Sequence, residues 1–139
     1  MLNIADFEIF KKVATPFYYY DIDLFEKTGD KVAELSARTG IKVHFSVKAN
    51  SDRRLNDILS SKGLGADCVS GNEVLAALKA GFPPEKIVFA GVAKKDNEIL
   101  LGIDNNIFCF NCESIEELEI IQQLAAGRAK TANVAFRIN

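Results

Sequence analysis

The feature that most constrains the fold is a repeated alternation of short apolar runs with longer amphipathic segments. The short runs are rich in residues favoured in β-strands and are PFYYYD (16–21), KVHFSVK (42–48), GADCVS (65–70), KIVFAG (86–91), NIFCFN (106–111) and NVAFRIN (133–139). The segments between them have helical periodicity and span 24–39, 52–62, 71–80, 95–102 and 114–126. Strands that alternate with helices predict an α/β fold with a mostly parallel sheet covered by helices.

Polar residues and glycines predict where the helices begin and end. Three pairs have the spacing of a capping box: Asp23 with Glu26, Ser70 with Glu73, and Ser114 with Glu117. Four glycines lie where a helix would end in a left-handed residue: Gly40, Gly63, Gly81 and Gly127. No linker or block of like charge interrupts these units, so residues 1–139 are predicted to belong to one domain.

Two architectures satisfy this order of elements, an open doubly wound sheet and a (β/α)₈ barrel. Strict alternation directs His44, Ser46 and Lys48 to one face of their strand, and directs Arg137 and Asn139 inward in theirs. A strand covered on both faces is usually apolar throughout. A barrel interior accepts polar groups towards its C-terminal mouth, where active sites lie. The pattern therefore favours the barrel.

Length limits how much of a barrel is present. A complete (β/α)₈ barrel takes about 250 residues, whereas these 139 residues supply five or six βα units. An unclosed barrel would expose unpaired strand edges. We therefore expect residues 1–139 to be the N-terminal part of a barrel in a longer protein.

Charge and hydropathy exclude several classes of protein. The formal net charge of −2 argues against a large basic surface for nucleic acid. No apolar run approaches the ~20 residues of a membrane span. The N-terminal MLNIADFEIFKK carries acidic residues within its apolar part, unlike a secretory signal. A cytoplasmic protein is expected.

The three cysteines are Cys68, Cys109 and Cys112. CFNC formally matches C-x-x-C, which permits a redox or zinc site. However, Cys109 lies in an apolar strand-like run and no second pair is present. Buried, reduced and unreactive thiols are the preferred interpretation, and no metal site is predicted.

Lys48 is the residue best suited to covalent chemistry. A lysine amine that faces the mouth of a barrel condenses with an aldehyde once it is deprotonated, and burial favours the neutral form. Spacing alone favours the simpler interpretation, a solvated lysine just past a strand.

Several motifs, in order, make the sequence recognisable. HFSVKAN (44–50), GLGADCVSGNEVLAALKAGFPPEKIVFAG (63–91) and NVAFRIN (133–139), preceded by TPFYYYD (15–21), resemble the N-terminal barrel half of the alanine-racemase-like (fold-type III) decarboxylases that use pyridoxal 5′-phosphate. The resemblance covers Thr15 to Asn139. It implies that Lys48 is the catalytic residue, which holds the cofactor as an internal aldimine. Two small departures, Ser46 for alanine and Asn72 for glycine, do not affect that role.

The same resemblance implies four further cofactor-binding residues: Asp67, Ser70, Glu73 and Arg137. Asp67 would pair with the Lys48 ammonium or steady the site electrostatically. Arg137 would lie beside the phenolic oxygen of the cofactor, and a buried arginine needs such a partner. Three of these residues also have a simpler structural interpretation. Asp67 can be a turn residue after Gly65, and Ser70 with Glu73 can form a capping box. His44, four residues before Lys48, is predicted to pack inside the barrel.

Within this family, the motifs are most similar to those of enzymes that convert meso-2,6-diaminopimelate into L-lysine and carbon dioxide, acting as homodimers with shared active sites. Decarboxylases of ornithine, arginine or carboxynorspermidine, a racemase, and a non-catalytic pyridoxal-phosphate-binding barrel remain open as alternatives. By the resemblance, the phosphate-binding glycine turn, the substrate-binding residues and a C-terminal β-domain come after Asn139. We therefore expect this chain alone to have little or no activity.

Overall fold

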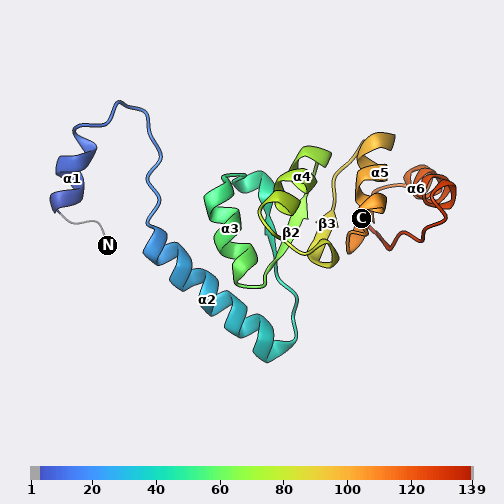
Figure 1. The fold of residues 1–139 in the computed structure, drawn as a ribbon, viewed down its shortest axis with the longest axis horizontal. Coiled ribbons are helices and arrows are strands. Elements are labelled where there is room, and N and C mark those ends of the chain that lie inside the picture. Colours follow the sequence, from blue (N-terminus) through green and yellow to red (C-terminus); the bar gives the residue numbers. More distant parts are fainter. Residues whose placement is uncertain (1–3, 139) are drawn as a thin grey trace.

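The computed structural model describes the backbone of residues 4–138 and the side chains from residue 7 to residue 138. The helices are α1 (Ile4–Phe10), α2 (Ile22–Thr39), α3 (Arg53–Ser61), α4 (Gly71–Lys79), α5 (Asp96–Asp104) and α6 (Ile115–Gly127). The strands are β1 (His44–Ser46), β2 (Gly65–Cys68), β3 (Ile87–Phe89), β4 (Cys109–Cys112) and β5 (Val134–Phe136). Two 3₁₀ turns, η1 (Val47–Ala49) and η2 (Pro84–Lys86), complete the order shown in Figure 1. The predicted inward direction of Asn139 lies outside the described residues.

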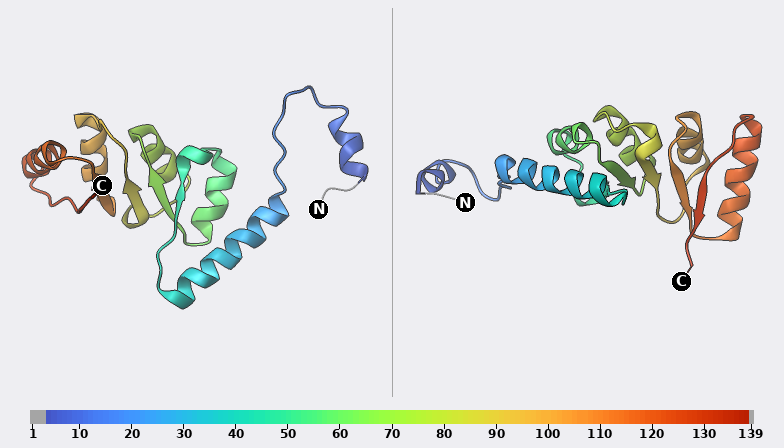
Figure 2. Two further views of the ribbon diagram at one scale, coloured as in Figure 1. Left: turned by 180° about the vertical axis from the view of Figure 1, so that it is seen from behind. Right: turned by 90° about the horizontal axis from the view of Figure 1, so that it is seen from below.

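The five strands form one parallel sheet whose spatial order, β1-β2-β3-β4-β5, is their order in the chain. An open doubly wound sheet reverses its strand order at a switch point, and this sheet does not. Helices α3, α4 and α5 lie along one side of the strands, as Figure 2 shows from below. The arrangement is that of part of a (β/α)₈ barrel, which confirms the predicted architecture.

The two faces of the sheet differ as the alternation predicts. The outer face, towards the helices, carries fully buried apolar side chains, among them Ala66, Ile87, Phe89 and Phe110. The inner face carries the row Ser46, Asp67, Val88 and Cys109, which are neighbours in register across β1 to β4. Three members of this row are only partly buried. The hydrophobic core therefore lies between strands and helices, and polar groups are left on the other side.

His44 and Gly65 pack closely on the inner face near the start of the strands. A Cβ atom on Gly65 would lie 2.7 Å from both His44 Nε2 and the Lys86 carbonyl oxygen, so only glycine fits there. The His44 ring also stacks on Phe108, with 6.1 Å between ring centroids. The prediction that His44 is a packed barrel residue is confirmed.

The predicted strand at 16–21 is wrong. The segment is extended, but it has no ladder with any described strand, and Tyr18 is 89% exposed. Extended backbone becomes a strand only when a neighbour supplies hydrogen-bond partners. The rings of this segment instead contact Phe10 in α1, a short helix that the sequence did not predict. Figure 1 shows α1 standing apart from the sheet.

Two predicted helix ends also need correction. Asp21, rather than Asp23, caps α2, because its Oδ1 accepts a hydrogen bond from Leu24 N at 2.9 Å and the helix begins two residues earlier. Gly127 is helical, and Ala129 takes the left-handed conformation beyond the end of α6. The other three glycines have the predicted positive φ. None of the helices in the described part of the chain is long and apolar enough to cross a bilayer.

Candidate active site

The candidate site lies at the edge of the sheet where the parallel strands end. Lys48 follows β1, Glu113 follows β4 and Arg137 follows β5. In a parallel sheet these ends share one edge, and in a barrel that edge is the mouth where active sites lie. Strand direction therefore brings residues that are far apart in the sequence to one edge of the sheet, where Lys48 lies at the β1 end and Arg137 at the β5 end.

Lys48 does not continue the strand, contrary to the predicted alternation. β1 ends at Ser46, and the chain turns through η1, which is closed by a 3.1 Å bond from Asn50 N to the Val47 carbonyl oxygen. Val47 is fully buried and anchors the turn, while Lys48 is exposed. Within residues 7–138 its amine has neither a hydrogen bond nor an ion pair, so no described group competes for it.

The loop after Lys48 is held by hydrogen bonds. Asn50 Nδ2 donates to the Tyr20 hydroxyl at 2.9 Å, and Asn50 Oδ1 accepts from Asp52 N at 2.9 Å. Asp52 caps α3, and hydrogen bonds from the Arg54 side chain and backbone lower the Asp52 pKa to about 2. These contacts connect the loop both to α3 and to the N-terminal extended segment.

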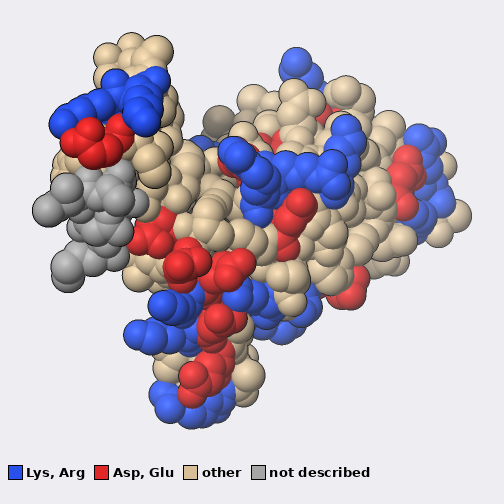
Figure 3. Space-filling view, turned by 60° about the vertical axis from the view of Figure 1, so that its left-hand side comes forward, with Lys and Arg blue, Asp and Glu red and all other residues tan. Residues whose placement is uncertain are grey.

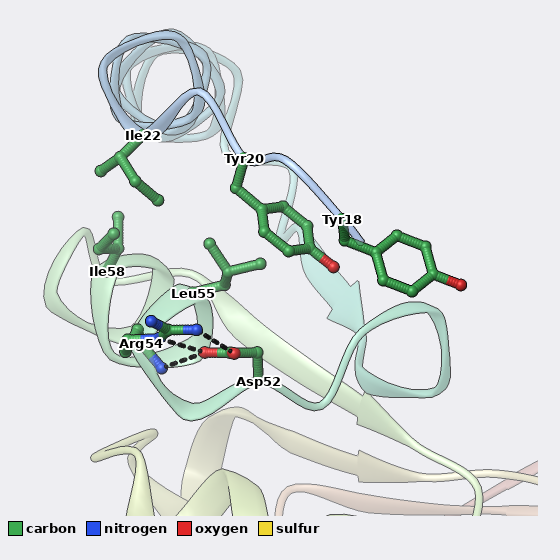
Figure 4. A pocket seen from close by; sticks show the side chains of 7 residues that line it. All are labelled: Tyr18, Tyr20, Ile22, Asp52, Arg54, Leu55 and Ile58. Atoms are coloured by element: carbon green, nitrogen blue, oxygen red, sulfur yellow. Dashed lines mark hydrogen bonds and ion pairs between the residues drawn. The ribbon is translucent and has the colours of Figure 1, made fainter. Parts of the chain in front are cut away.

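A groove of about 430 Å³ lies beside this loop, bounded by Tyr18, Tyr20, Ile22 and residues of α3, and Figure 4 shows the side chains that line it. The Asp52–Arg54 pair faces it from α3. None of the predicted site residues lines this groove. It lies on the helix side of the chain rather than among the inner-face residues of the sheet.

Asp67 lies in β2 on the inner face, opposite Ser46 in register. Its carboxylate is partly buried and has no hydrogen bond or ion pair among the described residues, so it does not contact Lys48 here. Burial lowers the pKa of nearby His44, and the negative charge of Asp67 opposes that shift. Ser46 Oγ beside it is buried, also without a described partner. The inner face thus carries one buried hydroxyl and one partly exposed carboxylate that have no hydrogen-bond partner among the described residues.

Ser70 and Glu73 form the cap of α4. Ser70 Oγ accepts from Glu73 N at 3.3 Å, and Glu73 Oε2 accepts from Val69 N at 2.9 Å. Both side chains are occupied within the turn after β2. The predicted cap by Ser70 is confirmed, whereas Glu73 bonds to the N–H of Val69, one residue before the cap, and not to that of Ser70 as in a capping box.

Arg137 is paired with a residue that the sequence did not single out. Its Nη1 lies 3.5 Å from Glu113 Oε2, and the Glu113 side chain is only 16% exposed. Both border a groove of about 280 Å³ at the ends of β3 to β5. The position of Glu113 could have indicated this pair, because Glu113 follows β4 as Arg137 follows β5. The residues before them, Cys112 and Phe136, are partners in register.

Two more charged residues near this edge were missed, Lys94 and Glu117. Their side chains form a 2.8 Å ion pair and are 1% and 12% exposed. The capping-box spacing of Ser114 and Glu117 was recognised, and Ser114 Oγ does accept from Glu117 N. Nothing in the local sequence indicated that Lys94, in a loop, would be buried.

The three thiols are free and buried. Burial raises the pKa of Cys68 to about 12 and also raises the pKa values of Cys109 and Cys112. Cys109 and Cys112 point to opposite faces of β4, so CFNC is not a dithiol motif in space. No group of His, Cys, Asp and Glu in the described residues is arranged to hold a metal ion. The prediction that the three thiols are buried is confirmed.

The surface charges are mixed. Figure 3 shows basic and acidic side chains interspersed over one face of the molecule, in line with the formal net charge of −2. A surface of this kind does not favour a polyanionic partner.

Comparison with known proteins gives the family. Residues 25–139 match the model of the pyridoxal-binding domain of pyridoxal-dependent decarboxylases, and the chain belongs to that family. Diaminopimelate decarboxylase of Bacteroides thetaiotaomicron is 51% identical over 100% of this chain and 36% of its own length. The L-glutamyl-[BtrI acyl-carrier protein] decarboxylase of Niallia circulans is 40% identical over 93% of this chain and 30% of its own.

Solved structures agree. Diaminopimelate decarboxylase from Methanocaldococcus jannaschii in complex with L-lysine has a TM-score of 0.82 at 37% identity, covering 94% of this chain and 31% of that one. The Helicobacter pylori enzyme complexed with L-lysine has a TM-score of 0.81 at 39% identity, covering 95% and 34%. The chain spans about a third of the length of these relatives.

The residues at this edge fit a pyridoxal cofactor. The group needs an amine to bind its aldehyde, and the Lys48 amine is exposed and has no partner among residues 7–138. Its phenolic oxygen is anionic and suits a guanidinium, which Arg137 places at the groove. The Ser46 hydroxyl and the Asp67 carboxylate, on the inner face of β1 and β2, also lack a hydrogen-bond partner among the described residues.

Proposed function

We propose that this chain carries the cofactor lysine of an amino-acid decarboxylase that converts meso-2,6-diaminopimelate into L-lysine and carbon dioxide. The observation that carries the proposal is Lys48, an exposed amine without a described partner at the C-terminal edge of a barrel-type sheet in a pyridoxal-binding domain. On this proposal, residues 1–139 form the N-terminal part of the barrel and supply its first five strands.

Lys48 is assigned the covalent bond to the cofactor aldehyde. When bound, pyridoxal phosphate accepts the electron pair left on the substrate Cα after carbon dioxide departs. The Lys48 amine would have to be neutral to bind the aldehyde, and whenever it is not bound it would be free to carry a proton at Nζ. The exposed turn η1 suits both tasks, because it leaves the side chain room to move.

Asp67 and Arg137 are assigned to the electrostatics of the site. Asp67 provides a negative charge on the inner face that favours a protonated partner nearby. Arg137, already paired with Glu113, provides a guanidinium for an anionic oxygen of the cofactor. Ser70 and Glu73 are assigned a supporting place, in which their hydrogen bonds hold the turn after Asp67 that borders the cofactor.

The choice of substrate is supported by the relatives named diaminopimelate decarboxylase, among them the one with 51% identity. The Niallia circulans relative, at 40% identity, is named for a glutamyl-carrier protein. Similar N-terminal thirds thus accompany different substrates. Ornithine, arginine and carboxynorspermidine are the competing substrates, and a non-catalytic pyridoxal-phosphate carrier is the competing class.

We also propose that the full-length protein works in the cytoplasm as a homodimer with shared active sites. These two properties rest on the resemblance to the family and not on the fold described above.

The experiment uses the full-length protein with pyridoxal phosphate. Carbon dioxide release is measured from meso-diaminopimelate, ornithine and arginine, for the wild type and for Lys48→Ala. Borohydride reduction followed by peptide mapping then locates the bound cofactor. We expect release from meso-diaminopimelate only, none from Lys48→Ala, and a label on Lys48. Preference for ornithine or arginine would refute the substrate, and a label elsewhere would refute the mechanism.

A further inference from the structure

Lys94, in the loop between β3 and α5, is a buried cation with all three ammonium protons in use. Nζ donates to the carbonyl oxygens of Gly91 at 2.6 Å and Asn111 at 2.9 Å, and to Glu117 Oε1 at 2.8 Å. It also lies 5.5 Å from the centroid of the Phe89 ring. The lysine therefore ties the ends of β3 and β4 to the first turn of α6.

Glu117 uses its two carboxylate oxygens for different partners. Oε1 accepts from Lys94, and Oε2 accepts from the backbone N–H of Glu113 at 2.7 Å. A carboxylate is suited to this bridge because both of its oxygens accept hydrogen bonds. The backbone of Glu113 is thereby held at the end of β4.

The side chain of Glu113, whose backbone is held by Glu117, forms an ion pair with Arg137. Its carboxylate lies 3.5 Å from the Arg137 guanidinium, across the groove at the ends of β3 to β5. The backbone N–H of Arg137 donates to the Cys112 carbonyl oxygen at 3.0 Å, whereas its side chain is 61% exposed, so contacts of the guanidinium, among them the one with Glu113, decide where that group lies. The less exposed Glu113 is the better fixed partner of the two.

We propose that Lys94 and Glu117 are positioning residues of the cofactor site, acting through Glu113 to hold the Arg137 guanidinium. The inference rests on the proposed function, because it assigns Arg137 to the cofactor. It goes beyond that function by extending the site to a buried ion pair that touches neither cofactor nor substrate.

The test is a double-mutant cycle on the full-length protein, with the dissociation constant for pyridoxal phosphate measured by absorbance titration. Glu117→Gln retains the size of the side chain but leaves one carbonyl oxygen, which cannot accept fully from both Lys94 and Glu113. We expect about tenfold weaker cofactor binding, and less than about a twofold effect when Arg137→Met is already present. An equal effect in both backgrounds would overturn the proposal.

Lys130→Met is the control, because Lys130 likewise donates to two carbonyl oxygens, those of Ile103 and Asp104, but before β5. It should lower the unfolding temperature without changing cofactor affinity or the pH dependence of the bound cofactor's visible absorption. Glu117→Gln should change both the cofactor affinity and the pH dependence of the absorption, and a loss of stability alone would overturn the proposal. If Glu117→Gln does not fold, Glu113→Gln takes its place in the same cycle, with the same outcomes.

Borohydride mapping on the wild type separates the two proposals. A label away from Lys48 refutes the proposed function. A label on Lys48 together with additive effects in the cycle refutes only the positioning role.

Discussion

Asn56 Nδ2 donates to the carbonyl oxygens of Asn50 and Asp52, at 3.2 and 2.8 Å, and so joins the first turns of α3 to the loop that follows Lys48. Asn56 is 2% exposed, and its Oδ1 has no hydrogen-bond partner in the described part of the chain. The side chain is used only as a donor. At this position an amide can donate both hydrogen bonds, whereas a carboxylate of the same shape cannot.

Asn56→Asp is expected to lower the free energy of unfolding by about 2–4 kcal/mol, because a buried carboxylate would face two carbonyl oxygens without an N–H to offer. Urea unfolding of the full-length protein measures the change. The matched control is Asn97→Asp, on the exposed surface of α5, which should stay within about 0.5 kcal/mol of wild type. Equal losses in the two variants would contradict the donor role of Asn56.

Gly65→Ala is expected to cost about 1–3 kcal/mol of stability, because the new methyl group would overlap the His44 ring and the Lys86 carbonyl oxygen. Gly127→Ala is the control, since it is helical and nothing lies within 4 Å of the added Cβ. That variant should gain about 0.5–1 kcal/mol, the usual preference for alanine in a helix. Thermal unfolding distinguishes the two signs, and a neutral Gly65→Ala would show that His44 is free to move aside.

Glu98 makes stability depend on pH. Its carboxylate accepts from Gly71 N at 2.7 Å and from Lys95 N at 3.1 Å, and these hydrogen bonds hold its pKa below the ordinary value. A lowered native pKa contributes stability that is present above the ordinary pKa of about 4.3 and is lost as the pH falls through the native pKa.

Wild type should therefore be more stable than Glu98→Gln at pH 7, and the difference should shrink below pH ~4. Chemical unfolding at a series of pH values tests this. Glu119→Gln, at an exposed carboxylate of α6, should give a curve parallel to wild type. A gap between wild type and Glu98→Gln that stays constant with pH would show that the hydrogen bonds do not favour the charged form.

The cysteines should react slowly in the folded protein. Burial and raised pKa values keep all three thiols protonated and covered. A thiol reagent at pH 7.5 should label native protein at least about a hundredfold more slowly than protein in urea, because the thiolate is the reactive form. Rapid labelling of two thiols, Cys109 and Cys112, without unfolding would revive the redox interpretation of CFNC.

Local chemistry predicted most of the elements and several of their ends. Ser70 and Ser114 cap helices as their spacing indicates, and Gly40 ends α2 with a positive φ. These features depend on residues within one turn of each other, so they are visible in the sequence. The predicted strand at 16–21 was wrong because a strand depends on a partner, and alternation alone does not supply one.

The candidate site also has a part that the sequence predicts and a part that it does not. The positions of Lys48 and Arg137 at strand ends follow from the order of strands and from a resemblance in motif. Their real surroundings do not, because η1 turns Lys48 out of the strand, and Glu113 meets Arg137 only through the pairing of β4 with β5.

The amino-acid sequence by itself determined most of the succession of strands and helices, the caps at Ser70 and Ser114 and the apolar outer face, and it pointed to Lys48 as the proposed reactive amine. Each of these depends on neighbours in the chain. Only the tertiary structure decided that Lys94 is buried, that Glu117 bridges it to Glu113, and that Asp67 has no described hydrogen-bond partner on the inner face. The burial of Lys94 and its pairing with Glu117 depend on the distance between segments roughly 20 or more residues apart in the chain. These segments come together only when the sheet has formed, because closing the long loops between them costs conformational entropy.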